Sequence, residues 1–266
     1  FVIWELDTQY PIVNLRLFKD RNFTVGVTTL STAFMVYIGA IVLLPLVLQT
    51  QLGYTATRAG LATAPIGFFP VLLTPLIGKF SHRMDMRVLV SISFTIYAAC
   101  FFWRSEFTVQ MDFMDVFWPQ LIQGIGMAMF FMPLTQITMS YMQGHQIASA
   151  SSLSNFVRIL AGGIGTSLVT TLWDRREAVH HSRLAEAINP YNDTTTQVMQ
   201  NMSNLGLDSR QQSGVIENLL EQQTHIMGAN DIFWLCGAIF LLLIVLVWRA
   251  KPPFMNQGGG GGGGAH

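Results

Sequence analysis

The chain has 266 residues, of which 51% are hydrophobic and only 11% are charged, whereas a typical soluble domain has about 25% charged residues. This composition excludes an ordinary soluble domain and predicts a membrane protein. The net charge is zero and no long basic run is present, so nucleic-acid binding is not indicated. Cys100 and Cys236 lie in apolar stretches, where we expect small buried hydrophobes rather than a disulfide or metal framework.

The first residue is not methionine, and residues 1–4 resemble the last turn of an apolar helix. We therefore interpret the sequence as a C-terminal fragment, in which residues 1–22 hold the end of a preceding helix and a cytoplasmic linker. At the other end, residues 258–264 are an unbroken run of glycine. We expect residues 250–266 to form a flexible, Gly-rich cytoplasmic tail.

Six stretches are long and apolar enough to cross a membrane, which takes about 20 mostly apolar residues. They predict an all-α membrane protein with a six-helix transmembrane bundle over residues 23–249. The expected helices cover residues 23–48, 56–80, 88–103, 116–141, 147–173 and 232–248. The second contains Pro65, Pro70 and Pro75, which predict kinks.

Arginine and lysine in the short loops predict the orientation, because these residues are retained on the cytoplasmic side. On the other side, only Arg58 and Arg104 occur in the short loops. The first side collects Arg16, Lys19, Arg21, Lys79, Arg83, Arg87, Arg249 and Lys251. We therefore expect the chain to start and end in the cytoplasm and residues 174–229 to form an outer loop, periplasmic in a Gram-negative cell.

The outer loop is polar but has helical spacing in residues 174–187 and 208–223, with a turn around 189–193. Asp208 is a plausible cap for the second segment. Two interpretations stay open. The segments form a small helical hairpin that rests on the membrane domain, or they form a docking site for a partner.

Residues 148–168 place one arginine, Arg158, in an otherwise apolar and small-residue helix. At 1.5 Å per residue it lies about 15 Å inside a core that is about 30 Å thick. A charge there costs at least about 2.5 kcal/mol, so it is expected to face the bundle interior, a water-filled cavity or a carboxylate. Arg158 either belongs to a transport pathway or ties helices together. No intramembrane carboxylate of this chain offers an obvious partner.

Helical spacing gathers further candidate residues around Arg158. Asn155 shares its face, and the fourth stretch has a face of glutamine, methionine and phenylalanine that suits varied apolar ligands. The expected substrate cavity is lined by Phe34, Tyr37, Gln120, Gln123, Met127, Phe130, Phe131, Asn155 and Arg158. Ordinary helix packing stays the alternative for each aromatic residue.

Small residues in the fourth and fifth stretches predict close helix packing, as small residues at fixed spacing do between bilayer helices. The residues are Gly124, Gly126 and Ala128 in the fourth stretch and Gly162, Gly163 and Gly165 in the fifth. No catalytic or metal centre is indicated. His180 and His181 lack cysteine or acidic ligands at metal spacing, and no enzyme activity is predicted.

The loop GKFSHRMDMR, residues 78–87, resembles a degenerate copy of the signature loop of the major facilitator superfamily. Gly78, Arg83 and Arg87 match that signature. The aspartate of the signature is His82 here, and Asp85 is the candidate to replace it. These four matching or substituting residues form the expected gating loop.

Five further strings cover residues 11–254: PIVNLRLFKDRNF, LGYTATRAGLATAPIG, FFMPLTQIT, ASSLSNFVRILAGGIGTS and KPPF. Together they resemble the C-terminal part of the fourteen-helix drug:proton antiporters of that superfamily. The resemblance implies a multidrug exporter of the bacterial inner membrane that exchanges hydrophobic drugs or uncouplers for protons by alternating access, with the proton gradient in place of a cofactor. It also implies a drug site near the midplane.

The resemblance further implies three partners: the N-terminal half of the same transporter, a periplasmic adaptor, EmrA, and an outer-membrane channel, TolC. It places the first and fourth stretches around the cavity, the second and fifth between the two halves, and the third and sixth outside as supports. Two alternatives remain. One is a facilitator for a polar or anionic solute with Arg158 as counter-ion, and the other is a membrane scaffold that docks the adaptor through residues 174–229.

Overall fold

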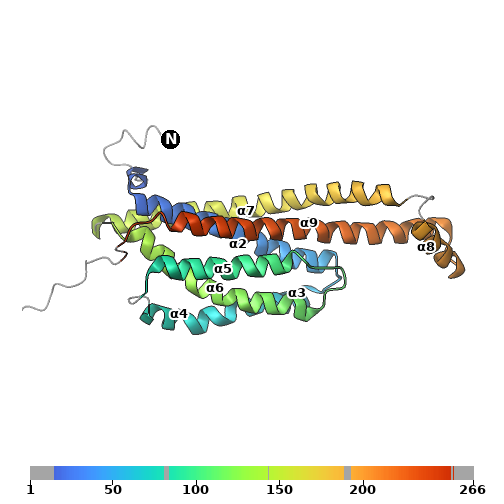
Figure 1. Cartoon of the computed structure of the whole chain (residues 1–266), viewed down its shortest axis with the longest axis horizontal. Coiled ribbons are helices and arrows are strands. Elements are labelled where there is room, and N and C mark those ends of the chain that lie inside the picture. Colours follow the sequence, from blue (N-terminus) through green and yellow to red (C-terminus); the bar gives the residue numbers. More distant parts are fainter. Residues whose placement is uncertain (1–14, 81–83, 143, 189–192, 253, 255–266) are drawn as a thin grey trace, which may run out of the picture.

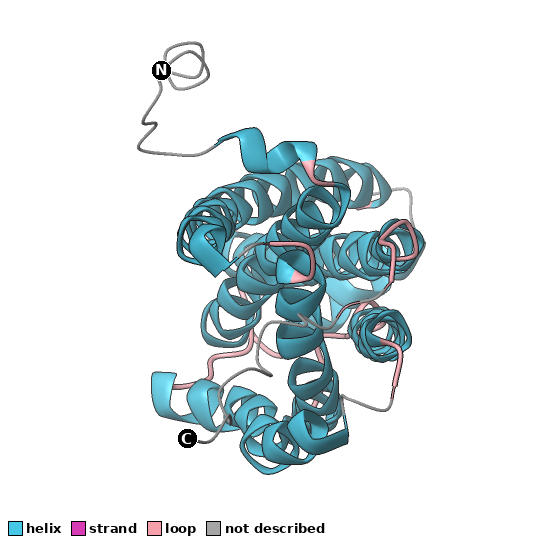
Figure 2. Ribbon diagram, turned by 90° about the vertical axis from the view of Figure 1, so that its left-hand side faces the viewer, coloured by secondary structure: helices cyan, strands magenta, loops and turns pink. Residues whose placement is uncertain are grey.

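The structure is a computed structural model that describes residues 15–80, 84–142, 144–188, 193–252 and 254. Within these residues every regular element is a helix, and six helical segments are long and apolar enough to cross a membrane. The predicted all-α fold with six crossings is therefore confirmed. Figure 2 looks along the bundle from one end and shows the helices packed side by side. The expectations for residues 1–4 and 258–264 lie outside the described residues.

The helices follow the chain in a simple order (Figure 1). A 3-10 helix, η1 (Leu15–Lys19), precedes α2 (Arg21–Thr50), which makes the first crossing. Three pieces make the second: α3 (Ala56–Thr63), the 3-10 helix η2 (Ala64–Gly67) and α4 (Phe68–Phe80). The remaining helices are α5 (Met86–Arg104), α6 (Phe113–Met139), α7 (Gly144–Ala187), α8 (Asp193–Asn204) and α9 (Ser209–Val247).

The second crossing is interrupted where its prolines lie. Pro65 occupies the first turn of η2, and Pro75 lies within α4. Proline lacks a backbone N–H and its ring clashes with the preceding turn, so a regular α-helix does not continue through it. The break at η2 is the local consequence of the proline pattern in the sequence.

A stack of aromatic rings forms the centre of the core between α5 and α9. Tyr97 and Phe240 lie parallel with ring centroids 4.7 Å apart, and Phe101 and Phe240 are 5.6 Å apart. All three side chains are fully buried. Aromatic pairs at such distances contribute about 0.5–1.5 kcal/mol beyond their burial, so this stack holds α5 and α9 together firmly.

Two crossings remain largely uncovered within this chain. In the most apolar window, 6% of the residues of the second crossing and 22% of those of α7 are buried, against 50–56% for α2, α5 and α6. Figure 1 shows α4 and α7 on opposite edges of the bundle. These are the two crossings that the family resemblance places between the halves of a transporter.

The structure draws the outer region differently from the sequence prediction. The predicted crossings ended near 173 and began again near 232, with residues 174–229 as a loop. Instead, α7 continues without a break to Ala187 and α9 already begins at Ser209. Figure 1 shows both helices extending past the ends of α5 and α6 toward α8. We call residues 174–188 and 193–231 the stalk.

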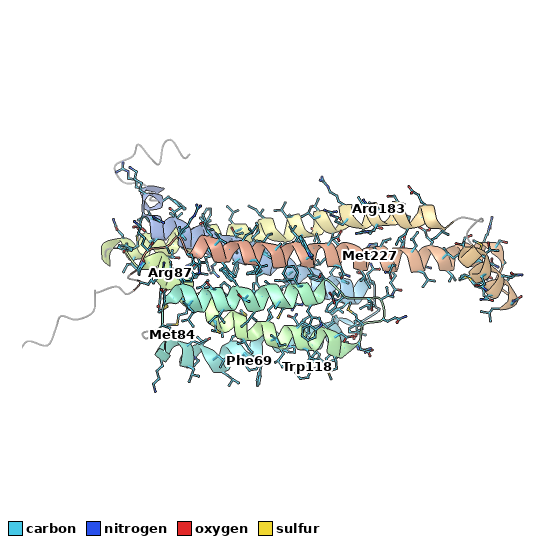
Figure 3. The ribbon with its side chains drawn as sticks, viewed as in Figure 1. Phe69, Met84, Arg87, Trp118, Arg183 and Met227 are labelled. Carbon is cyan, nitrogen blue, oxygen red and sulfur yellow. The ribbon has the colours of Figure 1, made fainter. Side chains whose placement is uncertain are left out.

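The stalk stays helical for identifiable reasons. The sequence has neither proline nor glycine between Trp173 and Ala187, so nothing stops α7 where the apolar stretch ends. Asp208 begins α9 with a capping box. Figure 3 labels Arg183 on the α7 part and Met227 on the α9 part of the antiparallel pair.

Polar contacts join the two stalk helices. The indole Nε1 of Trp173 donates to the His225 carbonyl oxygen at 2.8 Å. His180 Nε2 and Asp231 Oδ2 are 2.9 Å apart, and His181 Nε2 and Glu217 Oε1 are 3.1 Å apart. The pair is therefore laced together along its length rather than resting as a separate hairpin on the membrane domain.

At the other end of the bundle, residues 249–252 form a strap across the helix ends. Asn22 of α2 accepts from the Lys251 N–H at 2.8 Å and donates through Nδ2 to the Lys251 carbonyl at 2.7 Å. Arg87 of α5 donates to the Ala250 carbonyl at 3.1 Å, and the Tyr141 hydroxyl donates to the Pro252 carbonyl at 3.0 Å. The strap thus connects the end of α9 to three other helices.

Candidate functional site

Arg158 lies where three helices meet. Its guanidinium carbon is 4.6 Å from the ring centre of Phe34 on α2 and 5.1 Å from that of Phe131 on α6. Its Nη2 donates to the side-chain oxygen of Asn155 at 3.1 Å. A cation over the faces of two aromatic rings is attracted by both ring quadrupoles. The structure therefore brings four of the predicted cavity residues into one cluster.

The charge of Arg158 is not neutralised by a carboxylate within the described residues. None of the ion pairs there includes Arg158, and its buried Nε has no hydrogen-bond partner among them. A guanidinium with unused N–H donors beside two aromatic faces is able to hold a group that is both flat or apolar and hydrogen-bond accepting.

Tyr37 and Met127 extend this cluster. The Tyr37 ring lies 6.0 Å from that of Phe34, and its hydroxyl donates to the sulfur of Met127 at 3.3 Å. Phe131 is 43% exposed, so one of its faces is open. We call Phe34, Tyr37, Met127, Phe131, Asn155 and Arg158 the Arg158 cluster.

The other predicted cavity residues point elsewhere. Phe130 is buried and packs against Tyr97 and Phe94. Neighbouring residues of a helix point about 100° apart, so Phe130 and Phe131 do not share a face. Gln120 and Gln123 are also buried in the bundle, with 3% and 1% exposure.

The partner of both glutamines is Arg104, a residue that sequence reasoning assigned to an outer loop. Its Nη2 donates to Gln120 Oε1 at 2.8 Å and to Gln123 Oε1, and the side chain is only 2% exposed. An arginine at the end of a crossing usually reaches outward to water, which is why the sequence misled. Two glutamines one turn apart in an apolar helix were the available signal, since buried amides need partners.

The predicted packing glycines differ in how closely they are approached. A Cβ atom on Gly165 would lie 2.8 Å from the Met35 carbonyl carbon, and one on Gly124 would lie 2.6 Å from the Ile66 carbonyl oxygen. For Gly162 the nearest atoms belong to Phe34 and Ile38, both at 3.6 Å. Backbone therefore meets backbone at Gly165 and Gly124, while Gly162 borders the Arg158 cluster.

The predicted gating loop lies at the strap end. Asp85 caps α5 by accepting from the Arg87 N–H at 2.9 Å and forms an ion pair with the Arg87 guanidinium at 3.2 Å. Arg87 also lies over the rings of Trp248 and Phe254, and Figure 3 shows it at this end with Met84. Gly78 is in α4. Arg83 and His82 lie outside the described residues.

Comparison with known proteins adds sequence relationships to this geometry. Residues 6–166 match the family model described as Major Facilitator Superfamily. Over 258 residues, 97% of the chain, the identity is 55% with fatty acid resistance protein FarB of Neisseria gonorrhoeae and 53% with multidrug export protein EmrB of Escherichia coli K12. These matches cover 51% and 50% of the two relatives. The chain therefore spans about half the length of the curated relatives it matches.

Proposed function

The chain belongs to the major facilitator superfamily, and from this premise we propose that it forms the C-terminal half of a proton-driven multidrug exporter. The predicted resemblance to the superfamily and to EmrB is confirmed. EmrB is named for multidrug export and FarB for fatty acid resistance. The proposal places the six crossings in the bacterial inner membrane, with the strap in the cytoplasm and the stalk in the periplasm.

The Arg158 cluster is the observation that carries the proposal. Two aromatic faces, a flexible methionine and an arginine without a carboxylate partner among the described residues surround one point between α2, α6 and α7. Rings and thioether adapt to apolar compounds of different shape, and the guanidinium orients any acceptor group they carry. Such a combination supports binding of diverse lipophilic compounds.

Alternating access supplies the mechanism that we propose for transport. Drug and proton would bind in turn to a central site that opens to one side at a time. The uncovered faces of the second crossing and of α7 offer the surface against which an N-terminal half would rock. The carboxylates of a proton relay are expected in that half.

Substitution of Arg158 tests this function. In the intact transporter, Arg158→Ala should abolish resistance to exported drugs at a normal membrane level, whereas Arg158→Lys should retain part of it because it keeps the charge. Arg183→Ala is the matched control, since Arg183 lies on the same helix but is exposed on the stalk. Full resistance in Arg158→Ala would reduce Arg158 to packing and remove the main support for the proposal.

A facilitator for a polar or anionic solute is the second candidate, and the uncompensated charge of Arg158 is the observation that favours it. Competition in membrane vesicles separates the two functions. Mutual competition among chemically unrelated lipophilic compounds supports the exporter. One saturable anionic substrate that none of them displaces supports the facilitator.

We also propose that the stalk contacts a periplasmic adaptor of the EmrA type, in an assembly completed by an outer-membrane channel of the TolC type. The stalk projects beyond the bundle and exposes apolar side chains there, with Leu205 80% and Leu219 56% exposed. Deletion of residues 176–228 with a short linker tests this proposal and the scaffold alternative. Lost adaptor binding with retained vesicle transport supports docking, and unchanged complex formation contradicts it.

A further inference from the structure

Arg104, Gln120 and Gln123 form a polar triad inside the apolar bundle. The single Nη2 group of Arg104 donates to the side-chain oxygens of both glutamines, and the guanidinium carbon lies 5.3 Å from the ring centre of Phe101. None of the ion pairs among the described residues includes Arg104, and its buried Nε has no partner there. The triad therefore buries one positive charge against two neutral amides.

Stability alone does not account for such a triad. Well-packed apolar side chains of similar volume are often at least as stabilising as a buried charged group. An arginine at a helix end also has the alternative of extending to water. What a directional polar contact provides, and apolar packing does not, is a fixed register between the elements that it joins.

The element whose register the triad fixes is α6. Gln120 and Gln123 are three residues apart, so they lie on one face of α6 and meet Arg104 of α5 together. A rotation of α6 by one residue position, about 100°, would carry both amides away from the guanidinium. Only one rotational setting of α6 therefore satisfies both hydrogen bonds.

The same helix carries part of the Arg158 cluster. Met127 follows Gln123 by one turn, and Phe131 follows Met127 by another. Met127 accepts from Tyr37, and Phe131 lies over Arg158. The rotational setting of α6 thus decides whether these two side chains face α2 and α7.

We propose that Arg104 is a positioning residue that sets the rotation of α6 and thereby determines which side chains meet the substrate. The inference about selectivity rests on the proposed transport function. The inference about rotation does not, because it concerns the contact between α2 and α6 alone. The two are therefore tested by separate measurements.

Cross-linking measures the rotation directly. Tyr37→Cys and Met127→Cys are introduced into the intact protein with Cys100→Ala and Cys236→Ala, and disulfide formation is followed in membranes under copper-phenanthroline oxidation. We expect Arg104→Met to slow this cross-link about tenfold and Arg104→Lys to restore most of it. Arg58→Met is the matched control, because Arg58 lies at the same end of the bundle but is exposed.

A triple variant separates register from packing. Arg104→Met with Gln120→Leu and Gln123→Leu fills the same space without a charge, so it is expected to reach the membrane even where Arg104→Met alone misfolds. Positioning predicts that its cross-linking stays slow although its thermal stability is restored. Cross-linking at the unsubstituted rate in the triple variant overturns the proposal and leaves the triad as packing.

Transport kinetics test the consequence for selectivity. The triple variant and Arg104→Met should change the apparent KM for a bulky lipophilic dye relative to a small one by about tenfold, with Arg58→Met unchanged. Altered cross-linking with an unchanged KM ratio overturns the link to selectivity. If the unsubstituted protein exports neither compound while the cross-link still depends on Arg104, the proposed function fails and the positioning role stands.

Discussion

Gly165 offers a sharp test of how α2 and α7 pack. Its Cβ position lies 2.8 Å from the Met35 carbonyl carbon, and the Cβ position of Gly39 on α2 lies 3.0 Å from the Gly165 carbonyl oxygen. Backbone atoms do not move aside as a flexible side chain does, so Gly165→Ala has to push the two helices apart. Overpacking of this kind costs about 1–3 kcal/mol, of which the higher helix propensity of alanine offsets about 1 kcal/mol.

Gly163 is the matched control, because it lies two residues away on the same helix and a Cβ there would meet nothing within 4 Å. Gly163→Ala should therefore be neutral or stabilising by up to about 1 kcal/mol. We expect the free energies of unfolding of the two variants, measured by reversible SDS titration of the purified protein, to differ by about 1–3 kcal/mol. Equal values would show that α2 and α7 are not in backbone contact at Gly165 and would refute the reasoning.

Two further predictions concern the ends of the bundle. Asn22→Ala removes both hydrogen bonds to Lys251 and one to Ser140, so amide exchange in residues 249–252 should accelerate at a cost of about 1–3 kcal/mol; unchanged protection would mean that other contacts hold the strap. Trp173→Phe keeps the ring but loses the bond to the His225 carbonyl, which should lower the protection of the stalk helices by about 1 kcal/mol in the same experiment, whereas the crossings should be unaffected.

Hydropathy predicted the six crossings well because the bilayer imposes both the length and the apolar character of a spanning helix. It did not predict where the helices end. The fall in hydropathy after Trp173 marks the end of the apolar segment, but a helix stops only where its backbone is interrupted or capped. Residues 174–187 contain no such signal, and α7 accordingly continues to Ala187.

The candidate site was predictable in its residue types but not in its grouping. Helical spacing associated Asn155 with Arg158, and the structure adds Phe34 and Phe131 from other helices. Spacing within one helix says nothing about which residue of another helix it will meet. For the same reason, the partner of the two glutamines, Arg104, was not found from the sequence.

Gly163 and Gly165 illustrate the same limit at a finer scale. Both are small residues on the fifth crossing, and the sequence offers no reason to distinguish them. A difference of two residues turns the side-chain position by about 200° around the helix, so Gly165 faces Met35 and Gly163 faces away from the other helices. The close contact depends on where α2 lies, which is a property of the whole bundle.

The unbroken course of α7 and α9 makes the stalk a lever. Residues 174–187 of α7 extend about 20 Å beyond Trp173 at 1.5 Å per residue, without the proline or paired small residues that usually produce a hinge. A tilt of α7 within the membrane is therefore carried outward as a sideways displacement of the stalk tip. A spectroscopic label at Arg183, on the exposed side of this lever, would follow the opening and closing of the membrane domain without entering the Arg158 cluster.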